Sequence, residues 1–85
     1  MDLKELAKSR NAKNVFCNRL GIQIRDIAPG RAVVVKTVGP EDVNPLGIPH
    51  GGVYFSMADT ACGTAMATHG YAAVTMDANY HFLKS

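Results

Sequence analysis

The stretch that decides the fold is NPLGIPHGGVYFSMAD, residues 44–59. It begins with residues typical of a turn, passes through His50-Gly51-Gly52 and continues into a long apolar segment. Asp59 is the only Asp, Glu, Lys or Arg between Asp42 and Asp77. A single carboxylate in such an apolar segment has to be neutralised, paired or used in chemistry. We interpret Asp59 as a functional residue.

The apolar segment itself, from about residue 51 to residue 68, is predicted to be a helix. It is apolar nearly all round and rich in Ala and Gly, and a helix without a polar face is a buried one. Small residues allow close approach, so we expect a sheet wrapped around this helix. His69-Gly70 is a plausible end, because Gly is common just after a helix.

The remaining elements follow from local patterns. Asp2 is a good N-cap for a short helix over about residues 2–12. Alternating or β-branched residues at 22–27 and 31–38 flank Pro29-Gly30, which predicts an antiparallel hairpin. Residues 73–83 (AVTMDANYHFL) predict a third strand. The order is β-β-α-β, an α+β fold with few strands to cover so long a helix.

Composition narrows the class of protein. The 85 residues are 47% hydrophobic and 19% charged, with a net charge of +2 and scattered basic residues. This is a globular profile without the footprint of a nucleic-acid-binding protein, and no apolar run is long enough to span a bilayer without polar interruption. Cys17 and Cys62 lie far apart and form no CxxC pair, so neither a disulfide framework nor a zinc site is predicted. We expect one cytoplasmic domain with no metal, nucleic-acid or membrane partner.

The start of the central helix could bind a carbonyl oxygen. The N–H groups of Gly51 and Gly52 are first-turn donors without intrahelical acceptors, and the helix dipole adds positive potential there. This is the geometry of an oxyanion hole, although a Gly-Gly pair also serves as a tight junction between loop and helix. His50 could orient a water or a carbonyl, or only hydrogen-bond within its loop.

The spacing between Gly51 and Asp59 constrains any shared chemistry. Eight helical residues rise about 12 Å, whereas a base and an oxyanion hole must meet at one carbonyl carbon, within about 3 Å of each group. One helix therefore cannot supply both groups to one site, but two facing helices of a two-fold dimer can. The alternative is a structural Asp59 that is hydrogen-bonded to Thr or backbone neighbours.

These residues resemble a known family. Asn44, Gly47, His50-Gly51-Gly52 and Asp59, followed by a strand ending in Phe82-Leu83, are similar to the hotdog-fold acyl-CoA thioesterases, in particular the PaaI-like (phenylacetate-pathway) subfamily. The motif is Asn-x5-His-Gly-Gly-x6-Asp, and the resemblance covers essentially the whole chain. It implies a hotdog fold, an antiparallel sheet wrapped around a long central helix. Because the family continues with further strands, residues 1–85 are expected to be a single thioesterase-like domain that lacks its C-terminal strands.

The resemblance also implies an activity. It is hydrolysis of an acyl-CoA thioester to the free acid and coenzyme A, without a separate cofactor, in a homodimer or a tetramer of two dimers. The Gly51 amide would polarise the thioester carbonyl, and Asp59 of the facing subunit would act as general base or nucleophile. Asn44 and His50 would hold the water or the carbonyl, and Thr75 matches a hydroxyl near the attacking water.

The acyl group is less defined. An aryl or medium-chain acyl group is implied by the subfamily alone. Gly52, Tyr54 and Phe55 are candidates for substrate binding, although aromatic residues on a buried helix also serve as core.

Three other interpretations stay open. A hotdog dehydratase would act on 3-hydroxyacyl thioesters, but such enzymes usually lack the His-Gly-Gly run. A non-catalytic acyl-CoA-binding module would keep the pocket but would need no base, so Asp59 counts against it. An inactive fragment of a longer enzyme is the third.

Overall fold

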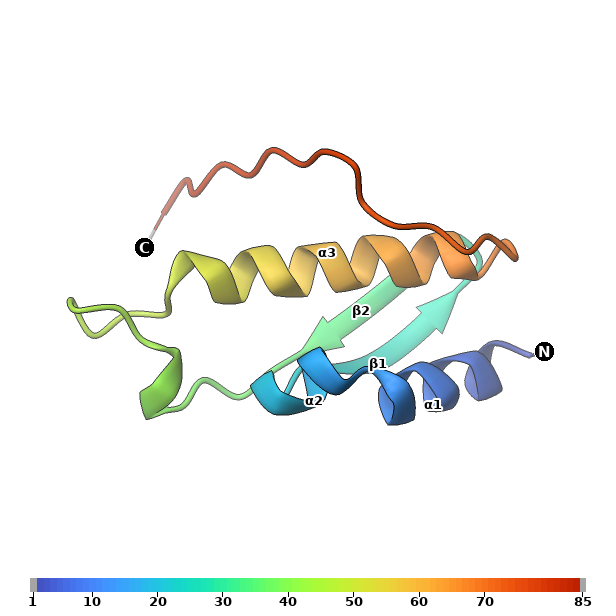
Figure 1. The fold of residues 1–85 in the computed structure, drawn as a ribbon, viewed down its shortest axis with the longest axis horizontal. Helices are drawn as coiled ribbons and strands as arrows, with labels where there is room; N and C mark the ends of the chain where they lie inside the picture. The colour runs from blue at the N-terminus through green and yellow to red at the C-terminus, as the bar shows by residue number, and fades with distance from the viewer. Residues whose placement is uncertain (1, 85) are drawn as a thin grey trace.

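The computed structural model describes residues 2–84 as two short helices, a hairpin, a long helix and an extended C-terminal segment (Figure 1). The helices and strands are α1 (Leu3–Lys13), α2 (Val15–Leu20), β1 (Gln23–Ala28), β2 (Arg31–Val35), the 3-10 turn η1 (Pro40–Asp42) and α3 (Gly51–Ala67). Within these residues no helix combines the length and apolar character needed to cross a membrane.

Side-chain caps set the bounds of the N-terminal helices. The Glu5 N–H donates to Asp2 Oδ1 at 2.8 Å, as expected for the predicted N-cap of α1. The Cys17 N–H donates to Asn14 Oδ1 at 3.0 Å, so Asn14 caps α2, a helix that the sequence patterns did not predict. The α2 helix ends at Gly21, whose φ of 73° is left-handed and favours glycine.

The predicted hairpin forms. Strands β1 and β2 pair antiparallel, with Ala28 opposite Arg31 across the Pro29-Gly30 turn. The Gly30 N–H donates to Thr68 Oγ1 at 2.7 Å, which fastens the turn to the C-terminal end of α3. Strand β2 ends at Val35, before the predicted end at residue 38.

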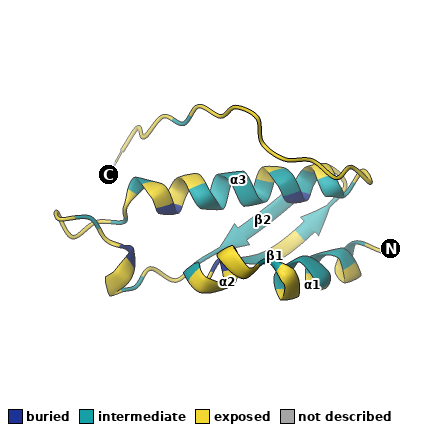
Figure 2. Ribbon diagram, in the orientation of Figure 1, coloured by how far each residue is buried: buried dark blue, intermediate teal, exposed yellow. Residues whose placement is uncertain are grey.

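Helix α3 spans the predicted range. It packs over the hairpin, mainly on β2, while α1 packs against β1. Ile22 and Thr64 are fully buried, and Cys17 and Val53 are nearly so. Figure 2 shows how few residues reach this level of burial among those described. The α+β class is confirmed as part of a hotdog fold, but the sheet covers one side of α3 and does not wrap around it.

The third strand that was predicted at residues 73–83 does not form. Residues 71–84 run extended along α3, on the side away from the hairpin, and pair with no strand of the described chain (Figure 1). Val74 and Met76, two apolar residues of this segment, are 96% and 97% exposed. The reason is that a strand needs hydrogen-bonding neighbours, and α3, whose backbone groups are satisfied internally, separates this segment from β1 and β2.

One side chain of α1 takes the place of a neighbouring strand. Asn11 Nδ2 donates to the Ile24 carbonyl at 3.1 Å, and the Ile24 N–H donates to Asn11 Oδ1 at 2.8 Å. These bonds lie beside the irregularity between Ile24 and Asp26 in the β1–β2 register. Asn11 therefore satisfies backbone groups of β1 that would otherwise be unpaired.

We expect Asn11→Ala to lower the free energy of unfolding by about 1–2 kcal/mol, because it leaves the partly buried N–H and carbonyl of Ile24 without partners. The loss should appear although Ala is the better helix former. Urea unfolding measures it, with Asn79→Ala, an exposed position, as the matched control. Equal stability of the two variants would contradict this role of Asn11.

Candidate active site

Asn44 folds the loop that leads into α3. Its Oδ1 accepts hydrogen bonds from the N–H groups of Leu46 (2.9 Å) and Ile48 (3.3 Å), and its own N–H donates to the Ile48 carbonyl at 2.8 Å. Gly47 supplies the left-handed conformation (φ 80°) that this turn requires. The side-chain oxygen of Asn44 thus stabilises the turn of the loop, while its side-chain amide nitrogen takes no part in these hydrogen bonds.

His50 caps the helix directly. Its Nδ1 accepts from the Gly52 N–H at 2.8 Å, and its carbonyl accepts from the Val53 N–H at 3.0 Å. Because Nδ1 accepts, the ring proton of the neutral imidazole lies on Nε2. Two first-turn amides are therefore occupied, and of the two glycines only Gly51 keeps an N–H that the cap does not use.

An ion pair holds the base of this loop. Asp42 Oδ2 lies 3.0 Å from Lys36 Nζ and accepts from the Gly39 N–H at 2.7 Å. The Asp42 carbonyl accepts from the His50 N–H at 2.8 Å, and Lys36 also donates to the Leu20 carbonyl. The Gly39 N–H, and after it the Lys36 ammonium, hold the pKa of Asp42 below its usual 3.8. Asp42 and Lys36 thereby position His50, a role that the sequence patterns did not reveal.

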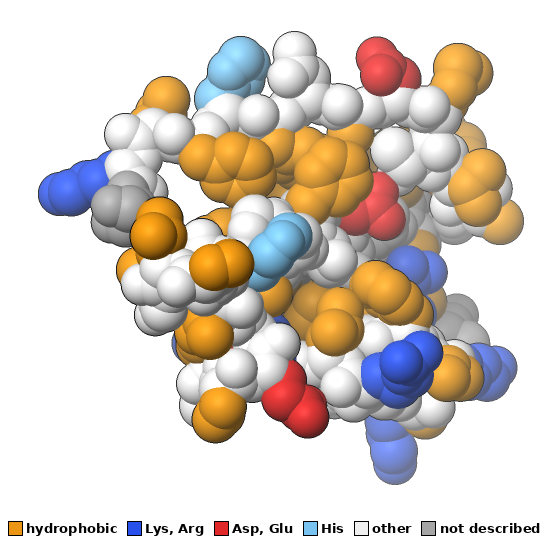
Figure 3. Space-filling view, turned by 60° about the vertical axis from the view of Figure 1, so that its left-hand side comes forward, with side chains coloured by type: hydrophobic (Ala, Val, Ile, Leu, Met, Phe, Trp, Pro, Cys, Tyr) orange, Lys and Arg blue, Asp and Glu red, His pale blue; other side chains and the backbone are white. Residues whose placement is uncertain are grey.

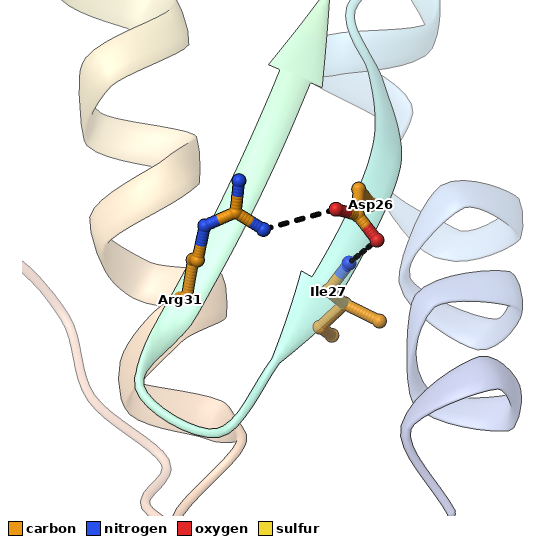
Figure 4. A network of polar contacts seen from close by, with 3 residues as sticks. All are labelled: Asp26, Ile27 and Arg31. Atoms are coloured by element: carbon orange, nitrogen blue, oxygen red, sulfur yellow. Dashed lines mark hydrogen bonds and ion pairs between the residues drawn. The ribbon is translucent and has the colours of Figure 1, made fainter.

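Arg31, the first residue of β2, forms a second ion pair with an acidic residue. Its Nη1 lies 2.9 Å from Asp26 Oδ2, and the Ile27 N–H donates to the same carboxylate (Figure 4). The guanidinium, with the Ile27 N–H second, lowers the pKa of Asp26. Both side chains are 59% exposed, so this pair contributes little to stability.

A groove opens at the start of α3. It has a volume of about 350 Å³, and Gly51 lies in it between Asn44 on the loop and Phe82 on the C-terminal segment. The Phe82 ring lies 3.5 Å from the position that a Cβ on Gly51 would take, and 6.0 Å from the Tyr54 ring centroid to centroid. Hydrophobic side chains gather on this face of the molecule, below the C-terminal segment (Figure 3).

Asp59 lies further along the same helix and contacts Thr75. The Thr75 hydroxyl donates to Asp59 Oδ1, and both residues belong to the predicted site. Between this pair and the groove, the rings of Phe55 and Tyr80 pack against each other at a tilt of 53°, with centroids 4.1 Å apart. Burial raises the pKa of Tyr80, and the negative charge of Asp59 adds to the rise.

The structure thus brings the predicted site residues together in two groups. Asn44, Gly51 and Tyr54 line the groove, with His50 and Gly52 bonded to each other beside it. Asp59 and Thr75 form the second group, about 12 Å along the helix by its rise per residue. The roles proposed for these residues stay predictions.

Three residues near the chain's end were not predicted as site residues. Phe82, Leu83 and Lys84 line the groove with Gly51. Only the path of the folded segment brings Phe82 to Gly51. Among residues 2–84, no three His, Cys, Asp or Glu side chains cluster as metal ligands.

Comparison with known proteins identifies the fold. Residues 46–85 match the thioesterase superfamily. The chain is similar to acyl-coenzyme A thioesterase PaaI of Escherichia coli (strain K12), with 42% identity over 65 residues, 76% of this chain and 46% of that enzyme. It is also similar to the solved structure of the E. coli PaaI protein from the phenylacetic acid degradation operon, with 34% identity and a TM-score of 0.88 over 96% of this chain and 59% of that one. The chain spans about half the length of the curated relative, and the predicted resemblance is confirmed.

We expect Asp42→Asn to lower the melting temperature by several degrees at pH 7, because Lys36, 6% exposed, loses its counter-charge. A carboxylate whose pKa is lowered by folding stabilises the protein above its unfolded pKa, and that stability is lost as the pH falls through the folded pKa. The difference from the parent should therefore shrink below about pH 4. Thermal scans across pH measure it, with Asp26→Asn at the exposed pair as control. A similar effect of both variants would contradict the anchoring role of Asp42.

Proposed function

We propose that this chain, a PaaI-like member of the thioesterase superfamily with a partial hotdog fold, forms the acyl-transfer site of an acyl-CoA thioesterase. The observation that carries the proposal is that Gly51, whose N–H the helix cap does not use, lines the groove at the start of α3. The reaction is hydrolysis of a thioester to the free acid and coenzyme A.

The Gly51 N–H supplies the electrostatic part of the chemistry. An oxyanion forms on the thioester oxygen when a nucleophile attacks, and a preorganised N–H donor at a helix start stabilises that charge. The His50 ring keeps the first turn fixed through its bond to the Gly52 N–H. Gly51 carries no side chain, so the carbonyl oxygen can approach its N–H closely.

Asp59 supplies the nucleophilic part. As a general base, its carboxylate takes a proton from water while the water oxygen bonds to the carbonyl carbon, and the tetrahedral intermediate then releases the coenzyme A thiolate. As a nucleophile, it attacks the carbonyl carbon and displaces the coenzyme A thiolate, which gives a mixed anhydride that water hydrolyses to the free acid and the Asp59 carboxylate. The Thr75 hydroxyl, hydrogen-bonded to Asp59, holds the carboxylate in place or shares the attacking water.

The two groups act on one substrate only across a dimer. Both lie on the continuous helix α3, with about 12 Å between Gly51 and Asp59 by helix rise. A two-fold arrangement places Gly51 of one subunit opposite Asp59 of the other. We therefore propose a homodimer, or a tetramer built from two such dimers, with two sites per dimer.

The acyl group would lie in the groove. Tyr54, Phe82 and Leu83 provide apolar walls beside Gly51, which suits an aryl or medium-chain acyl group. The similar E. coli PaaI protein comes from the phenylacetic acid degradation operon, which supports an aryl acyl group in particular. Lys84 adds a positive charge at the groove.

Gly51→Pro tests the oxyanion hole, because Pro removes the N–H yet suits the first residue of a helix. The extended ψ of 143° at His50 is also the conformation preferred before Pro. We expect kcat for thiol release from phenylacetyl-CoA and hexanoyl-CoA to fall about 10²–10³-fold. Gly51→Ala is the matched control, since it adds the same Cβ beside Phe82 but keeps the N–H, and should lose much less activity than Gly51→Pro. An equal loss in both variants would mean that the defect is steric.

Asp59→Asn should also abolish thiol release, and mixing it with Gly51→Pro tests the shared site. Mixed dimers contain one site with both functional groups, so random one-to-one mixing of the two inactive variants should restore about a quarter of the parent activity. Circular dichroism confirms folding of each variant beforehand. Absence of any recovery in verified mixed dimers would contradict a site shared between subunits.

Phe82→Ala should change acyl preference, because it removes a wall of the groove beside Gly51. We expect the ratio of kcat/KM for a longer or bulkier acyl-CoA to that for hexanoyl-CoA to rise by about 10-fold or more. A change of this size is typical when a pocket gains room for several methylene groups. Phe16→Ala, at an exposed position on α2, is the control and should leave the preference unchanged. An unchanged preference in Phe82→Ala would place the acyl group elsewhere.

A further inference from the structure

Arg10 has an unusual environment on the side of the molecule away from the groove. It lies on α1, and its Nη2 lies 3.6 Å from the position that a Cβ on Gly63 would take, so the guanidinium lies against α3. Its Nε is buried and has no hydrogen-bond partner among residues 2–84. The two ion pairs within these residues are Arg31–Asp26 and Lys36–Asp42. Arg10 is thus a charged group without an acid beside it.

Arg10 also lines a cavity of about 440 Å³ between α1 and the end of α3. The volume is within the range of about 300–1,000 Å³ typical of small-molecule sites. Apolar side chains form most of the wall, namely Leu3, Leu6, Ala67, Tyr71 and Ala72. Arg10 is the one charged residue of this lining within the part of the chain that the structure describes.

Thr68, a second polar side chain in the wall, is already engaged. The Thr68 hydroxyl donates to the Ala65 carbonyl at 2.6 Å and accepts from the Gly30 N–H at 2.7 Å. This hydroxyl fixes the end of α3 against the hairpin turn. The charge of Arg10, which no acidic side chain of the described residues neutralises, therefore determines which ligand the cavity prefers. Because the buried Nε is not accessible from the cavity, a ligand meets the guanidinium at its terminal nitrogens. A positive charge without a counter-charge beside it favours an anionic ligand there.

We propose that this cavity binds a small monocarboxylate with an apolar chain, with the carboxylate on the Arg10 guanidinium and the chain against Leu3, Leu6 and Tyr71. The planar guanidinium matches a carboxylate in a two-bond arrangement. One positive charge balances one negative charge, whereas a phosphate dianion needs further donors. The apolar wall favours a hydrocarbon chain over a fully hydrated anion. This site goes beyond the proposed thioesterase activity and does not depend on it.

Nuclear magnetic resonance tests the proposal through the Arg10 Nε–H signal. The ¹⁵N-labelled chain is titrated with hexanoate, and with hexanamide as a neutral control of the same length. We expect a saturable shift of the Arg10 Nε–H signal and of the Tyr71 and Ala72 amides with hexanoate only. Equal shifts with hexanamide, or hexanoate shifts confined to other parts of the chain, would overturn the proposal.

Variants and a second anion make the test specific. Arg10→Gln should weaken hexanoate binding at least tenfold, whereas Arg25→Gln, at an exposed arginine of β1, should leave it unchanged. Undiminished binding by folded Arg10→Gln would overturn the proposal. Inorganic phosphate that binds as tightly as hexanoate would overturn the choice of an apolar carboxylate. If Arg10→Gln does not fold, the titrations of the parent chain with hexanoate, hexanamide and phosphate still test the proposal. None of these readouts uses thiol release, so this proposal and the thioesterase proposal can fail separately.

Discussion

The need to cover α3 is the constraint on which the rest of the structure depends. A helix that is apolar nearly all round is stable in water only where other elements bury it. The hairpin covers one side, and the buried Cys17 thiol meets the Thr60 hydroxyl at 3.1 Å, which joins α2 to α3. Among residues 2–84, the other side is covered by the extended segment alone, so Tyr54 and Phe55 remain 48% and 43% exposed. Such exposed apolar surface is typical of an interface, and it lies on the helix that carries Gly51 and Asp59.

Three successive residues at the start of α3 have three different roles. The carbonyl oxygen and the ring Nδ1 of His50 accept hydrogen bonds from N–H groups of the first turn, and the Gly52 N–H is the one that donates to the ring. Gly51 between them keeps an N–H that the cap does not use. A Cβ on Gly52 would lie 3.1 Å from the His50 ring nitrogen, which explains why glycine suits this position as well. The cap and the candidate oxyanion hole are thus parts of one local structure, held in place by Asp42 through the His50 N–H.

The C-terminal segment has a different geometry from the helix that it follows. An extended chain rises about 3.3 Å per residue and a helix 1.5 Å. Thr75 lies opposite Asp59 and Phe82 opposite Gly51, so the segment covers the same span with excess length and bows away from α3 (Figure 1). The ends of this arc make the contacts at the two candidate groups, and the groove opens near its last residues.

The sequence by itself determined the elements whose stability is local. The cap at Asp2, the turn at Pro29-Gly30 and the range of α3 follow from patterns within a few residues, as does the argument that Gly51 and Asp59 cannot share a site within one chain. Helix α2 was not predicted, because its six residues are too few to show a helical pattern of apolar residues. Only the tertiary structure decided that residues 71–84 are not a strand, that Phe82 lies over Gly51, and that Lys36 and Arg10 have such different surroundings. These outcomes depend on which segments become neighbours, because hydrogen bonds, burial and ion pairs between distant residues leave no periodic signal in the chain.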